Sequence, residues 1–406
     1  MLHARRLRRH PLLRGSALVT LAVVTFATTG AATAYVRLGN NIETHDISSL
    51  VRDIPMPEVT ETPDPTDPNA GRALNYLVMG SDSREGEDVV AADQVAGMRS
   101  DTTIVLHISA DRNRMDLVSI PRDSRVQIPS CNYFDGTSSR SQSARFNAAF
   151  SIGAAHDDVA EAAACTVNTV QSLTGIPLDG WVVADFAGFR DMVDALGGVE
   201  MCIPTEIYSL KASLHLQPGV QRLDGTTALS FARARTGTGL GNGSDIGRLG
   251  RQQQLLGSIA REVFAKNLLT DTPALYRFLT AATQSLKADP DTGNIGNLAG
   301  LSWSLRNIPP ANITFMTIPI AANPDDPNEV VWTSDAAQIW ANLATDVPMV
   351  PAAPTAPTTP TDAPTDGTVP TTPAVPAAPV EPVEPAVIPT PGLDPFTPAD
   401  IPAICG

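Results

Sequence analysis

The feature that most limits the fold of this 406-residue chain is an uncharged run of 22 residues near its N-terminus. Residues 15–36 contain no Asp, Glu, Lys or Arg, and Arg37 follows them directly. A helix of about 20 residues is long enough to cross a lipid bilayer. The run therefore predicts one transmembrane helix that separates a short N-terminal segment from everything that follows.

The segment before this run is strongly basic and contains Arg5, Arg6, Arg8, Arg9 and Arg14. Because Lys and Arg concentrate on the cytoplasmic side of a span, residues 1–14 are predicted to be cytoplasmic and the rest extracytoplasmic. A cleaved signal peptide is the alternative, since residues 32–34 (Ala-Thr-Ala) fit a cleavage site. The length of the run favours an uncleaved, single-pass anchor in the cell membrane.

Prolines dominate two regions on either side of the remaining sequence. Residues 37–70 show no helical or strand periodicity, so we expect a semi-rigid linker there. Sixteen of the 35 prolines fall between Pro351 and Pro402, mixed with Ala, Thr and Val. This composition cannot bury a core, so residues 346–406 are predicted to be a disordered tail. The folded domain is predicted over residues 71–345.

The chain has a net charge of −15, but the charge is unevenly distributed. No Lys or Arg follows Arg306, whereas 11 of the 43 Asp and Glu residues do. The first 306 residues therefore hold all 28 basic residues and 32 acidic ones, which leaves them close to neutral. The acidity belongs mainly to the last hundred residues, and no nucleic-acid partner is predicted.

The four cysteines are Cys131, Cys165, Cys202 and Cys405. None forms a Cys-x-x-Cys pair and no histidine cluster accompanies them, which argues against a zinc site. An even number of cysteines in an exported protein favours disulfides. Of the three pairings, we prefer Cys131–Cys165 with Cys202–Cys405, which would tie the end of the tail to the domain.

Between residues 71 and 345, apolar strands alternate with amphipathic helices. Strands are predicted at residues 73–79, 102–108, 114–120, 181–185 and 199–203, and helices at residues 157–173, 187–196, 224–231 and 244–265. A short polar turn joins the second and third strands into a hairpin, so they must be antiparallel. The pattern therefore predicts an α/β domain whose central sheet is mixed.

Arg and Asp residues gather at the ends of the predicted strands. Asp82 and Arg84 follow the first strand, at the edge of an open α/β sheet where ligands bind. Arg99 and Asp101 come directly before the next strand, so Asp82 and Asp101 could share one magnesium ion. The alternatives are an ordinary polar turn and a surface ion pair.

Two further arginines follow breaks in the predicted structure. Pro121 cannot continue a central strand, so it turns the chain and places Arg122 at the strand exit. Arg145 precedes an apolar segment and is expected to open a helix, where a solvated position is the alternative.

The helix predicted at residues 244–265 places Asp245, Arg248 and Gln252 on one face. Arg233 and Arg235 approach this face through a glycine-rich loop, residues 237–243, which we expect to be a flexible lid or hinge. The alternative is an exposed amphipathic surface. Arginine presents a flat fork of donors that fits two phosphate oxygens, and carboxylates hold magnesium, so the combined set predicts a pyrophosphate site.

Seven motifs in this order resemble the LytR–CpsA–Psr family of cell-wall glycopolymer transferases, over residues 74–340. They are residues 80–84 (Gly-Ser-Asp-Ser-Arg), 99–101 (Arg-Ser-Asp), 119–123 (Ser-Ile-Pro-Arg-Asp), 145–149 (Arg-Phe-Asn-Ala-Ala), 193–199 (Val-Asp-Ala-Leu-Gly-Gly-Val), 223–235 and 244–253. The chain departs from the family pattern in an extra acidic segment at residues 85–93, so the loop beside Asp82 is expected to be longer than is usual in the family.

The resemblance implies a mixed central sheet flanked by helices on both faces, with a polyprenyl chain in an apolar tunnel and its pyrophosphate at the mouth. It implies that Asp82 and Asp101 coordinate Mg²⁺, or Mn²⁺ in its place, and act in catalysis with Arg122 and Arg235. The remaining pyrophosphate-binding residues would be Arg84, Arg99, Arg145, Arg233, Asp245, Arg248 and Gln252.

The resemblance further implies a phosphotransferase that attaches a polyprenyl-pyrophosphate-linked glycopolymer to peptidoglycan through a phosphodiester bond. The cysteines and the Pro-Thr tail resemble those of members from high-GC Gram-positive bacteria, so arabinogalactan is the expected polymer, with teichoic acid or capsule as alternatives. A hydrolase that uses water as the acceptor would need the same residues. A scaffold that binds lipid or cell wall without catalysis is the third hypothesis.

Overall fold

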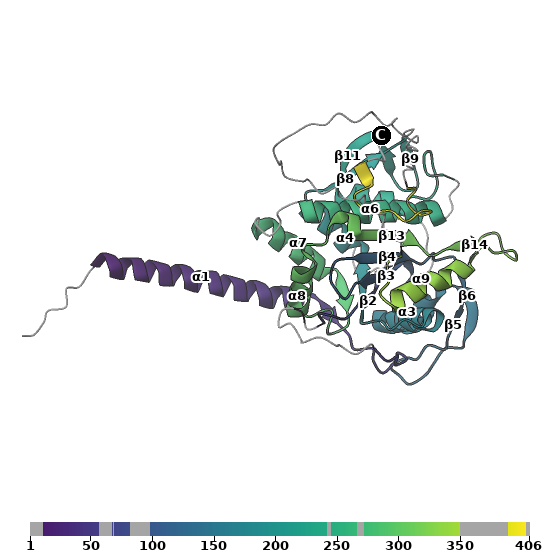
Figure 1. The fold of residues 1–406 in the computed structure, drawn as a ribbon, viewed down its shortest axis with the longest axis horizontal. Coiled ribbons are helices and arrows are strands. Elements are labelled where there is room, and N and C mark those ends of the chain that lie inside the picture. Colours follow the sequence, from purple (N-terminus) through teal and green to yellow (C-terminus); the bar gives the residue numbers. More distant parts are fainter. Residues whose placement is uncertain are drawn as a thin grey trace, which may run out of the picture.

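The computed structural model describes residues 11–56, 67, 69–81, 98–241, 245–265, 272–349 and 389–402. A seven-stranded sheet forms its centre, with the strand order β1-β12-β7-β2-β3-β4-β13 (Figure 1). The strands are β1 (Glu43–Thr44), β2 (Leu74–Ser81), β3 (Ser100–Ile108), β4 (Met115–Ser119), β7 (Gly180–Asp185), β12 (Leu286–Ala288) and β13 (Ile313–Thr317).

The central sheet is mixed, as predicted. β2 lies antiparallel to β3 and parallel to β7, β3 lies antiparallel to β4, and β4 lies parallel to β13. The hairpin expected from the short polar turn is confirmed as β3 and β4. The remaining strands pair in twos outside this sheet: β5 (Arg125–Ile128) with β6 (Gln142–Arg145), β8 (Val199–Ile203) with β11 (Gly219–Leu223), β9 (Ile207–Ser209) with β10 (Leu214–Leu216), and β14 (Ile320–Ala322) with β15 (Val330–Trp332).

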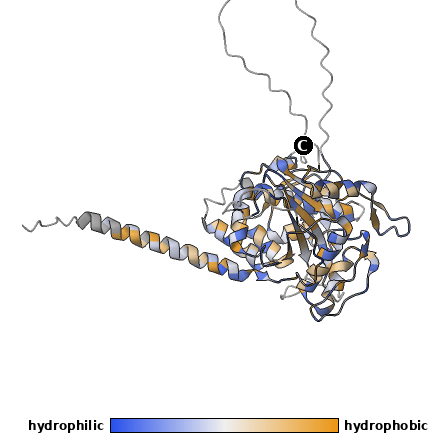
Figure 2. Ribbon diagram, turned by 60° about the horizontal axis from the view of Figure 1, so that its bottom comes forward, coloured by the Kyte–Doolittle hydropathy of each residue, from blue (hydrophilic) through white to orange (hydrophobic). Residues whose placement is uncertain are grey.

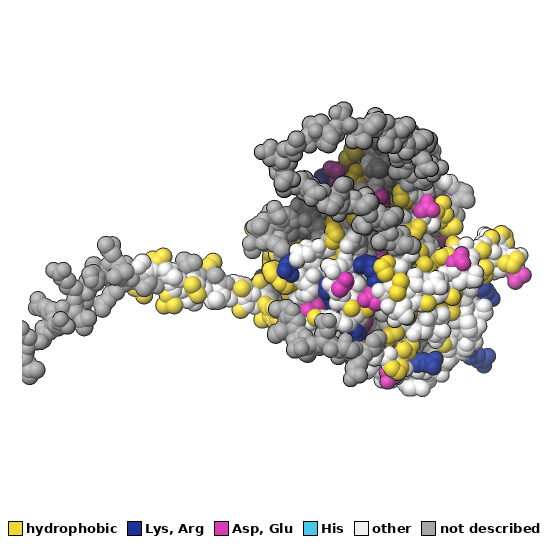
Figure 3. Space-filling model, in the orientation of Figure 1, with side chains coloured by type: hydrophobic (Ala, Val, Ile, Leu, Met, Phe, Trp, Pro, Cys, Tyr) yellow, Lys and Arg dark blue, Asp and Glu magenta, His cyan; other side chains and the backbone are white. Residues whose placement is uncertain are grey.

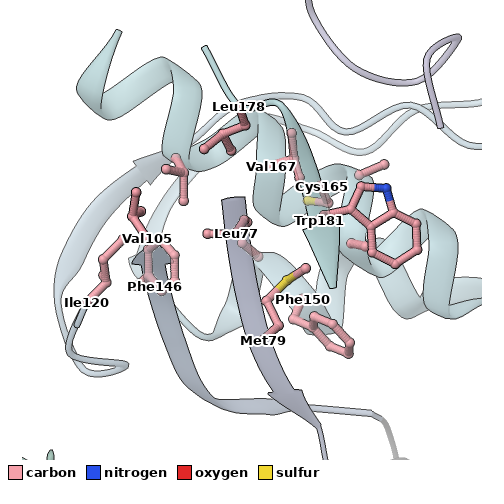
Figure 4. Packing of buried hydrophobic residues seen from close by; sticks show 14 of the residues in the cluster. Leu77, Met79, Val105, Ile120, Phe146, Phe150, Cys165, Val167, Leu178 and Trp181 are labelled. Atoms are coloured by element: carbon pink, nitrogen blue, oxygen red, sulfur yellow. The ribbon is translucent and has the colours of Figure 1, made fainter. Parts of the chain in front are cut away.

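One face of the sheet carries the main apolar core. Helices α2 (Ala148–Gly153), α3 (Val159–Thr174) and α9 (Ser334–Ala344) pack there against alternate residues of the strands. Figure 4 shows Leu77, Met79 and Val105 of the sheet beside Phe150 and Cys165 of these helices. The disulfide Cys131–Cys165, predicted as one of two, crosses this core and closes a separation of 34 residues.

The second face of the sheet is also covered by helices, so the predicted arrangement with helices on both faces is confirmed. α4 (Phe186–Ala195) contacts β7 there, and α6 (Asp245–Ala265) contacts β13. α5 (Gly225–Arg233) and α7 (Thr272–Gln284) pack against α4, and the end of α8 (Ile295–Leu305) packs near β4 and β13. Leu256 of α6 and Leu305 of α8 pack near Leu117 of β4 and Phe315 of β13. Side chains of β4 therefore pack in two different apolar cores: Val118 in the main core and Leu117 in the core beside α6 and α8.

Local sequence signals explain where several helices begin and end. The Asp158 side chain accepts hydrogen bonds from the backbone N–H groups of Ala160 and Glu161, which caps α3. Gly175 ends the same helix with φ +72°, a conformation that favours glycine. Asp185 and Asp224 cap α4 and α5 in the same way.

The N-terminal apolar run forms α1 (Pro11–Asn41), which contains one candidate membrane span at Leu18–Asn41. Figure 2 shows α1 projecting from the domain with apolar turns along its length. The helix enters the domain without a spacer, because Ile47 and Leu50 are buried in the main core and β1 pairs with β12.

The predicted linker at residues 37–70 is therefore wrong in its first part. Residues 37–51 belong to α1 and to the folded domain. The apolar side chains at positions 42, 47 and 50, spaced too irregularly to suggest an element, find their partners in distant strands and helices. Residues 57–66 and 68 lie outside the described residues.

The predicted disordered tail at residues 346–406 is likewise wrong at its end. Phe396 and Ile401 are both 1% exposed, and Phe396 exchanges two backbone hydrogen bonds with Phe315 at the outer edge of β13. Two aromatic rings thus stack across the sheet edge, with centroids 5.3 Å apart. Residues 350–388 lie outside the described residues. Cys202 is disulfide-bonded, and its expected partner, Cys405, also lies outside them.

Arg145 does not open a helix, contrary to the prediction. It is the last residue of β6, and α2 begins three residues later. The strand forms because residues 142–145 pair with β5, a contact that the local sequence does not indicate.

Candidate functional site

Charged residues from three distant segments converge where β3 begins, β4 ends and α6 starts. Figure 3 shows basic and acidic side chains gathered next to one another on the face seen in Figure 1. Asp101 is the second residue of β3, at an irregularity in its pairing with β2. Gly80 pairs with Thr102 and Ser81 pairs with Ser100, so Asp101 is the extra residue of a β-bulge. A bulge redirects a side chain, here towards the arginines that follow β4.

Arg122 forms the centre of this cluster. β4 ends at Ser119 and Pro121 turns the chain, as the sequence predicted. The Arg122 guanidinium donates a hydrogen bond to Asp101 Oδ1 at 2.5 Å and lies 3.5 Å from Asp245 Oδ1. Asp123 Oδ2 is 3.6 Å from its Nε. One guanidinium therefore links three carboxylates from three parts of the chain.

Arg248 is almost completely buried, with 2% of its side chain exposed, and its charge interacts with that of Arg122. Its Nη2 is 2.5 Å from Asp245 Oδ1, one helical turn earlier, and donates to the Asp101 backbone oxygen at 3.1 Å. Gln252 continues the same face of α6 and is 9% exposed. The polar face of α6 thus points into the site, and the exposed amphipathic surface considered as an alternative is excluded.

Arg235 and Arg145 complete the cluster from two sides. Arg235 follows α5, and its electrostatic neighbours are Arg122, Asp101, Asp245 and Asp123. Arg145 Nη1 lies 3.5 Å from Asp123 Oδ1. Its other side is held by loop carboxylates, with Nε 3.4 Å from Glu329 Oε1 and Nη2 4.0 Å from Asp326 Oδ2.

Burial and crowding shift the pKa values of these groups. Burial raises the pKa of Asp101, but Arg122 and Arg248 outweigh it, so the pKa lies below its ordinary value. Burial raises the pKa of Asp245 above its ordinary value despite the same arginines. Burial lowers the pKa of Arg248 to about 10 and, together with repulsion from Arg122, lowers that of Arg235. The lowered pKa values of Arg235 and Arg248 show that their positive charges are buried close to other arginines.

Several buried atoms of the cluster have no hydrogen-bond partner. They include Arg122 Nε, Arg235 Nη2, Arg248 Nε, Arg251 Nε, Gln252 Oε1 and both carboxylate oxygens of Asp245. Most buried polar groups in proteins are paired, and a buried unpaired donor costs about 1–3 kcal/mol. Four guanidinium nitrogens without hydrogen-bond partners in one cluster are a suitable environment for an anion with many oxygens, such as a pyrophosphate.

Not every predicted residue joins the cluster. Arg233 is the exposed last residue of α5, and its guanidinium lies over the Phe186 ring, 4.8 Å from the centroid. Arg99 directly precedes β3, two residues before Asp101, and its predicted role stays a prediction. Asp82 and Arg84 lie outside the described residues, so their predicted roles remain predictions.

The glycine-rich loop is not a free lid in its described part. Thr238 exchanges two backbone hydrogen bonds with Tyr208, at 2.9 and 3.1 Å. A Cβ at Gly237 would stand 2.0 Å from the Tyr208 backbone oxygen. Residues 237–239 therefore run tightly along β9, because only glycine permits that approach. Residues 242–244 lie outside the described residues.

The sequence prediction omitted three residues that the structure places at the cluster. Glu329 binds Arg145 and comes from a loop with no motif, so no sequence signal indicates it. Arg251 has its pKa lowered to about 10 by burial and by Arg248, its neighbour on α6. Asp123 follows Arg122 in the motif at residues 119–123, and an acidic side chain next to a site arginine is the signal that indicates it.

A metal ion was predicted between Asp82 and Asp101. Among the residues that the structure describes, no group of three or more His, Cys, Asp or Glu side chains is placed to hold a metal. Mg²⁺ usually binds through one or two carboxylates, retained waters and substrate phosphates. The partly exposed Asp101 carboxylate fits such a shared ion, and the magnesium site stays a prediction.

Comparison with known proteins decides the family. The profile of the LytR_cpsA_psr family matches residues 35–346, which include the whole cluster and the sheet that supports it. The chain belongs to the LytR–CpsA–Psr family. The resemblance inferred from the seven motifs is therefore confirmed, and the match begins within α1 rather than after the predicted linker.

Two relatives illustrate the range of this LytR–CpsA–Psr chain. The cell wall biosynthesis protein LcpA of Corynebacterium glutamicum is 27% identical over 292 residues, which cover 67% of this chain and 55% of LcpA. The polyisoprenyl-teichoic acid–peptidoglycan teichoic acid transferase TagV of Bacillus subtilis is 32% identical over 166 residues, which cover 40% of this chain and 38% of TagV. The chain thus spans little more than half the length of these relatives at most.

A solved structure supports the fold of this family member. The LytR-Csp2A-Psr enzyme from Actinomyces oris aligns with a TM-score of 0.50 and 21% identity, covering 73% of this chain and 95% of that structure. At this identity the likeness establishes the α/β fold alone.

Proposed function

We propose that the protein is a phosphotransferase that moves a cell-wall glycopolymer from a polyprenyl pyrophosphate to peptidoglycan. The observation that carries the proposal is the set of buried guanidinium nitrogens without hydrogen-bond partners around Asp101 and Asp245. Family membership and the similarity to the cell wall biosynthesis protein LcpA and the teichoic acid transferase TagV support a cell-wall substrate. Arabinogalactan is the polymer we propose, with teichoic acid or capsule as alternatives.

In the proposed reaction, a sugar hydroxyl of peptidoglycan attacks the phosphorus nearest the glycan. A new oxygen–phosphorus bond forms as the bond to the bridging oxygen breaks, and polyprenyl phosphate leaves with the electron pair. The hydroxyl proton passes to a base or to the leaving phosphate. The products are a phosphodiester-linked polymer and polyprenyl phosphate, so atoms and charge balance.

Phosphoryl transfer depends on position and charge neutralisation more than on covalent catalysis. Arg122, Arg235 and Arg248 supply this neutralisation in a buried setting, where electrostatic interactions are stronger than in water. Arg145 lies at the exposed side of the cluster and is suited to orient the incoming glycan phosphate. A magnesium ion held by Asp101, with Asp82, would add a further positive charge against the phosphate oxygens.

Asp82 and Asp101 are the two carboxylates that the family resemblance offers as the base, and the surroundings of Asp101 give it little support in that role. Its carboxylate is bonded to Arg122, and the arginines hold its pKa below the ordinary value, which weakens it as a proton acceptor. Burial raises the pKa of Asp245, which is better suited to accept a proton. We therefore assign Asp101 to orienting Arg122 and to the metal.

The proposal includes a place in the cell. α1 would anchor the protein as a single span, with the domain outside the cytoplasm near both the lipid-linked donor and the peptidoglycan acceptor. The apolar helix and the basic residues before it support this orientation.

The test uses the full chain in detergent with a labelled polyprenyl-pyrophosphoryl glycan, Mg²⁺ and peptidoglycan oligomers. We expect label on peptidoglycan, and a loss of rate on the order of 100-fold in Arg122→Ala. Arg261→Ala is the matched control, because Arg261 lies further along α6 and pairs with Glu200 at 3.0 Å. Label released only as free glycan phosphate would favour a hydrolase, and lipid binding without turnover would favour a scaffold.

A further inference from the structure

Two neighbouring helices are unusually apolar for the surface of an exported domain. α7 and α8 together contain one charged residue, Arg277, and no acidic residue. α8 has the sequence IGNLAGLSWSL, yet none of its residues is fully buried. A helix that is apolar but unburied exposes a surface that normally contacts a partner or a membrane.

Both helices expose an aromatic side chain, and the one on α8 lies beside a basic residue. Trp303 of α8 is 54% exposed and Tyr276 of α7 is 37% exposed. The Arg306 guanidinium lies 4.0 Å from the centre of the Trp303 ring. Trp and Tyr concentrate where a bilayer meets water, and Arg places its charge beside lipid phosphates while its stem stays in apolar surroundings.

The anchor helix lies directly beside α7 and α8, as Figure 1 shows where α1 meets the domain. Tyr276 faces a cleft of about 400 Å³ whose remaining lining comes from α1: Phe26, Thr29, Gly30, Thr33, Ala34 and Arg37. A few residues later, Asn41 Nδ2 donates a hydrogen bond to Thr283 Oγ1 at 3.1 Å, near the end of α7. α7 therefore runs along α1 rather than being held away from it.

The dimensions of a helix place this contact at membrane depth. Phe26 and Arg37 are 11 residues apart, which corresponds to about 16 Å along a helix. The hydrocarbon core of a bilayer is about 30 Å thick, and Arg37 marks the end of the uncharged run. The part of α1 that lines the cleft thus lies within the outer half of the predicted span. α7 packs along this part of α1 and therefore lies at the depth of the outer leaflet.

We propose that α7 and α8 form a membrane-docking face, which lies against the outer leaflet of the bilayer that α1 crosses. The occupant is phospholipid: its acyl chains contact Tyr276 and the apolar side chains, and its phosphates pair with Arg37, Arg277 and Arg306. This inference rests on the anchor part of the proposed function but on none of the chemistry. The membrane-docking face holds the domain close to the membrane surface in one orientation.

The test measures contact between Trp303 and lipid in the full chain, reconstituted into vesicles of phosphatidylcholine and phosphatidylglycerol. The acyl chains carry bromine either near the headgroup or near the bilayer centre, and tryptophan emission is recorded. α1 contains no tryptophan, and Trp181 and Trp340 are 2% and 4% exposed within the domain. Trp303→Phe removes the expected signal, and Trp332→Phe is the matched control.

We expect shallow bromine to quench the wild type and Trp332→Phe, and this quenching to be lost in Trp303→Phe. Equal emission with and without bromine, in vesicles that carry the protein through flotation, would overturn the membrane-docking face. Blue-shifted Trp303 emission that bromine does not quench would show that another protein copy covers the helices, which also overturns it. Because the measurement needs no turnover, an inactive protein still tests this inference.

Discussion

Arg235 and Arg248 lie in one cluster but differ in how their guanidinium groups are paired. Because of this difference, replacing each arginine should separate its effect on the transfer reaction from its effect on the stability of the fold. The buried Nη2 of Arg235 has no hydrogen-bond partner, and Arg122 repels its charge. Arg248 is fully buried and forms an ion pair with Asp245, with Nη2 2.5 Å from Oδ1. Replacing each arginine by Met keeps an apolar stem of similar length and removes only the guanidinium.

The two substitutions should change the free energy of unfolding in different ways. Arg235→Met removes a buried unpaired donor, which costs about 1–3 kcal/mol when a group is fully desolvated. Arg235 is only partly buried, so we expect the free energy of unfolding to stay unchanged or to rise by about 1 kcal/mol. Arg248→Met removes the nearest cation of the buried Asp245 carboxylate and leaves Arg122, 3.5 Å away. Loss of one member of a buried pair costs about 3–5 kcal/mol.

The expected effects on activity are the same in both variants. Each loses a guanidinium that stabilises charge in phosphoryl transfer, so the transfer rate should fall on the order of 100-fold or more. The assay combines chemical denaturation of the full chain in detergent with the peptidoglycan transfer reaction. Stability of Arg235→Met that falls as far as that of Arg248→Met would refute the reasoning, because Arg235 would then be a structural residue. Unchanged activity in Arg235→Met would refute it as well.

Three further predictions concern acid stability, the C-terminal segment and the disulfide. Burial raises the pKa of Asp101, but its arginine neighbours outweigh burial and hold the folded-state pKa below the ordinary value, so the ionised carboxylate stabilises the fold at neutral pH. Asp101→Asn should therefore lower the free energy of unfolding at neutral pH, and the difference from wild type should vanish as the pH falls from about 4, the unfolded-state pKa, through the folded-state pKa. Denaturation at several pH values measures this difference. Gly250→Ala should displace residues 389–402, because its Cβ would stand 2.1 Å from a backbone oxygen there, and hydrogen exchange in that segment should rise, whereas Gly247→Ala, with no neighbour closer than 3.7 Å, should leave it protected. Replacing Cys131 and Cys165 by Ser should cost about 3–4 kcal/mol in urea unfolding, because the bridge closes a separation of 34 residues; an equal stability of oxidised and double-Ser protein would contradict this.

Much of the sheet could be predicted from local patterns. β2, β3 and β4 appear as apolar runs, and the short turn after Ile108 dictates an antiparallel neighbour. The bounds of α3 follow from an aspartate that caps its start and a glycine that ends it. These signals are local because side-chain alternation and helix caps involve residues only a few positions apart.

Segments whose structure comes from distant partners were mispredicted. β1 pairs with β12 through Glu43 and Lys287, and the end of the chain pairs with β13 through Phe396 and Phe315. Both segments resemble linkers, because neither has enough apolar residues to form an element by itself. Each is ordered by a strand edge that an unrelated part of the chain supplies.

The sequence by itself determined the candidate membrane span, the α/β class and the residue types of the site, because these depend on composition, periodicity and short motifs. Only the tertiary structure decided which charged residues meet. Asp101 and Arg248 are 147 positions apart, yet Arg248 Nη2 donates a hydrogen bond to the Asp101 backbone oxygen at 3.1 Å. Glu329 and Arg145 meet across 184 positions, and Arg233 turns away to Phe186. Burial, unpaired donors and shifted pKa values follow from these distances in space, and spacing along the chain does not contain them.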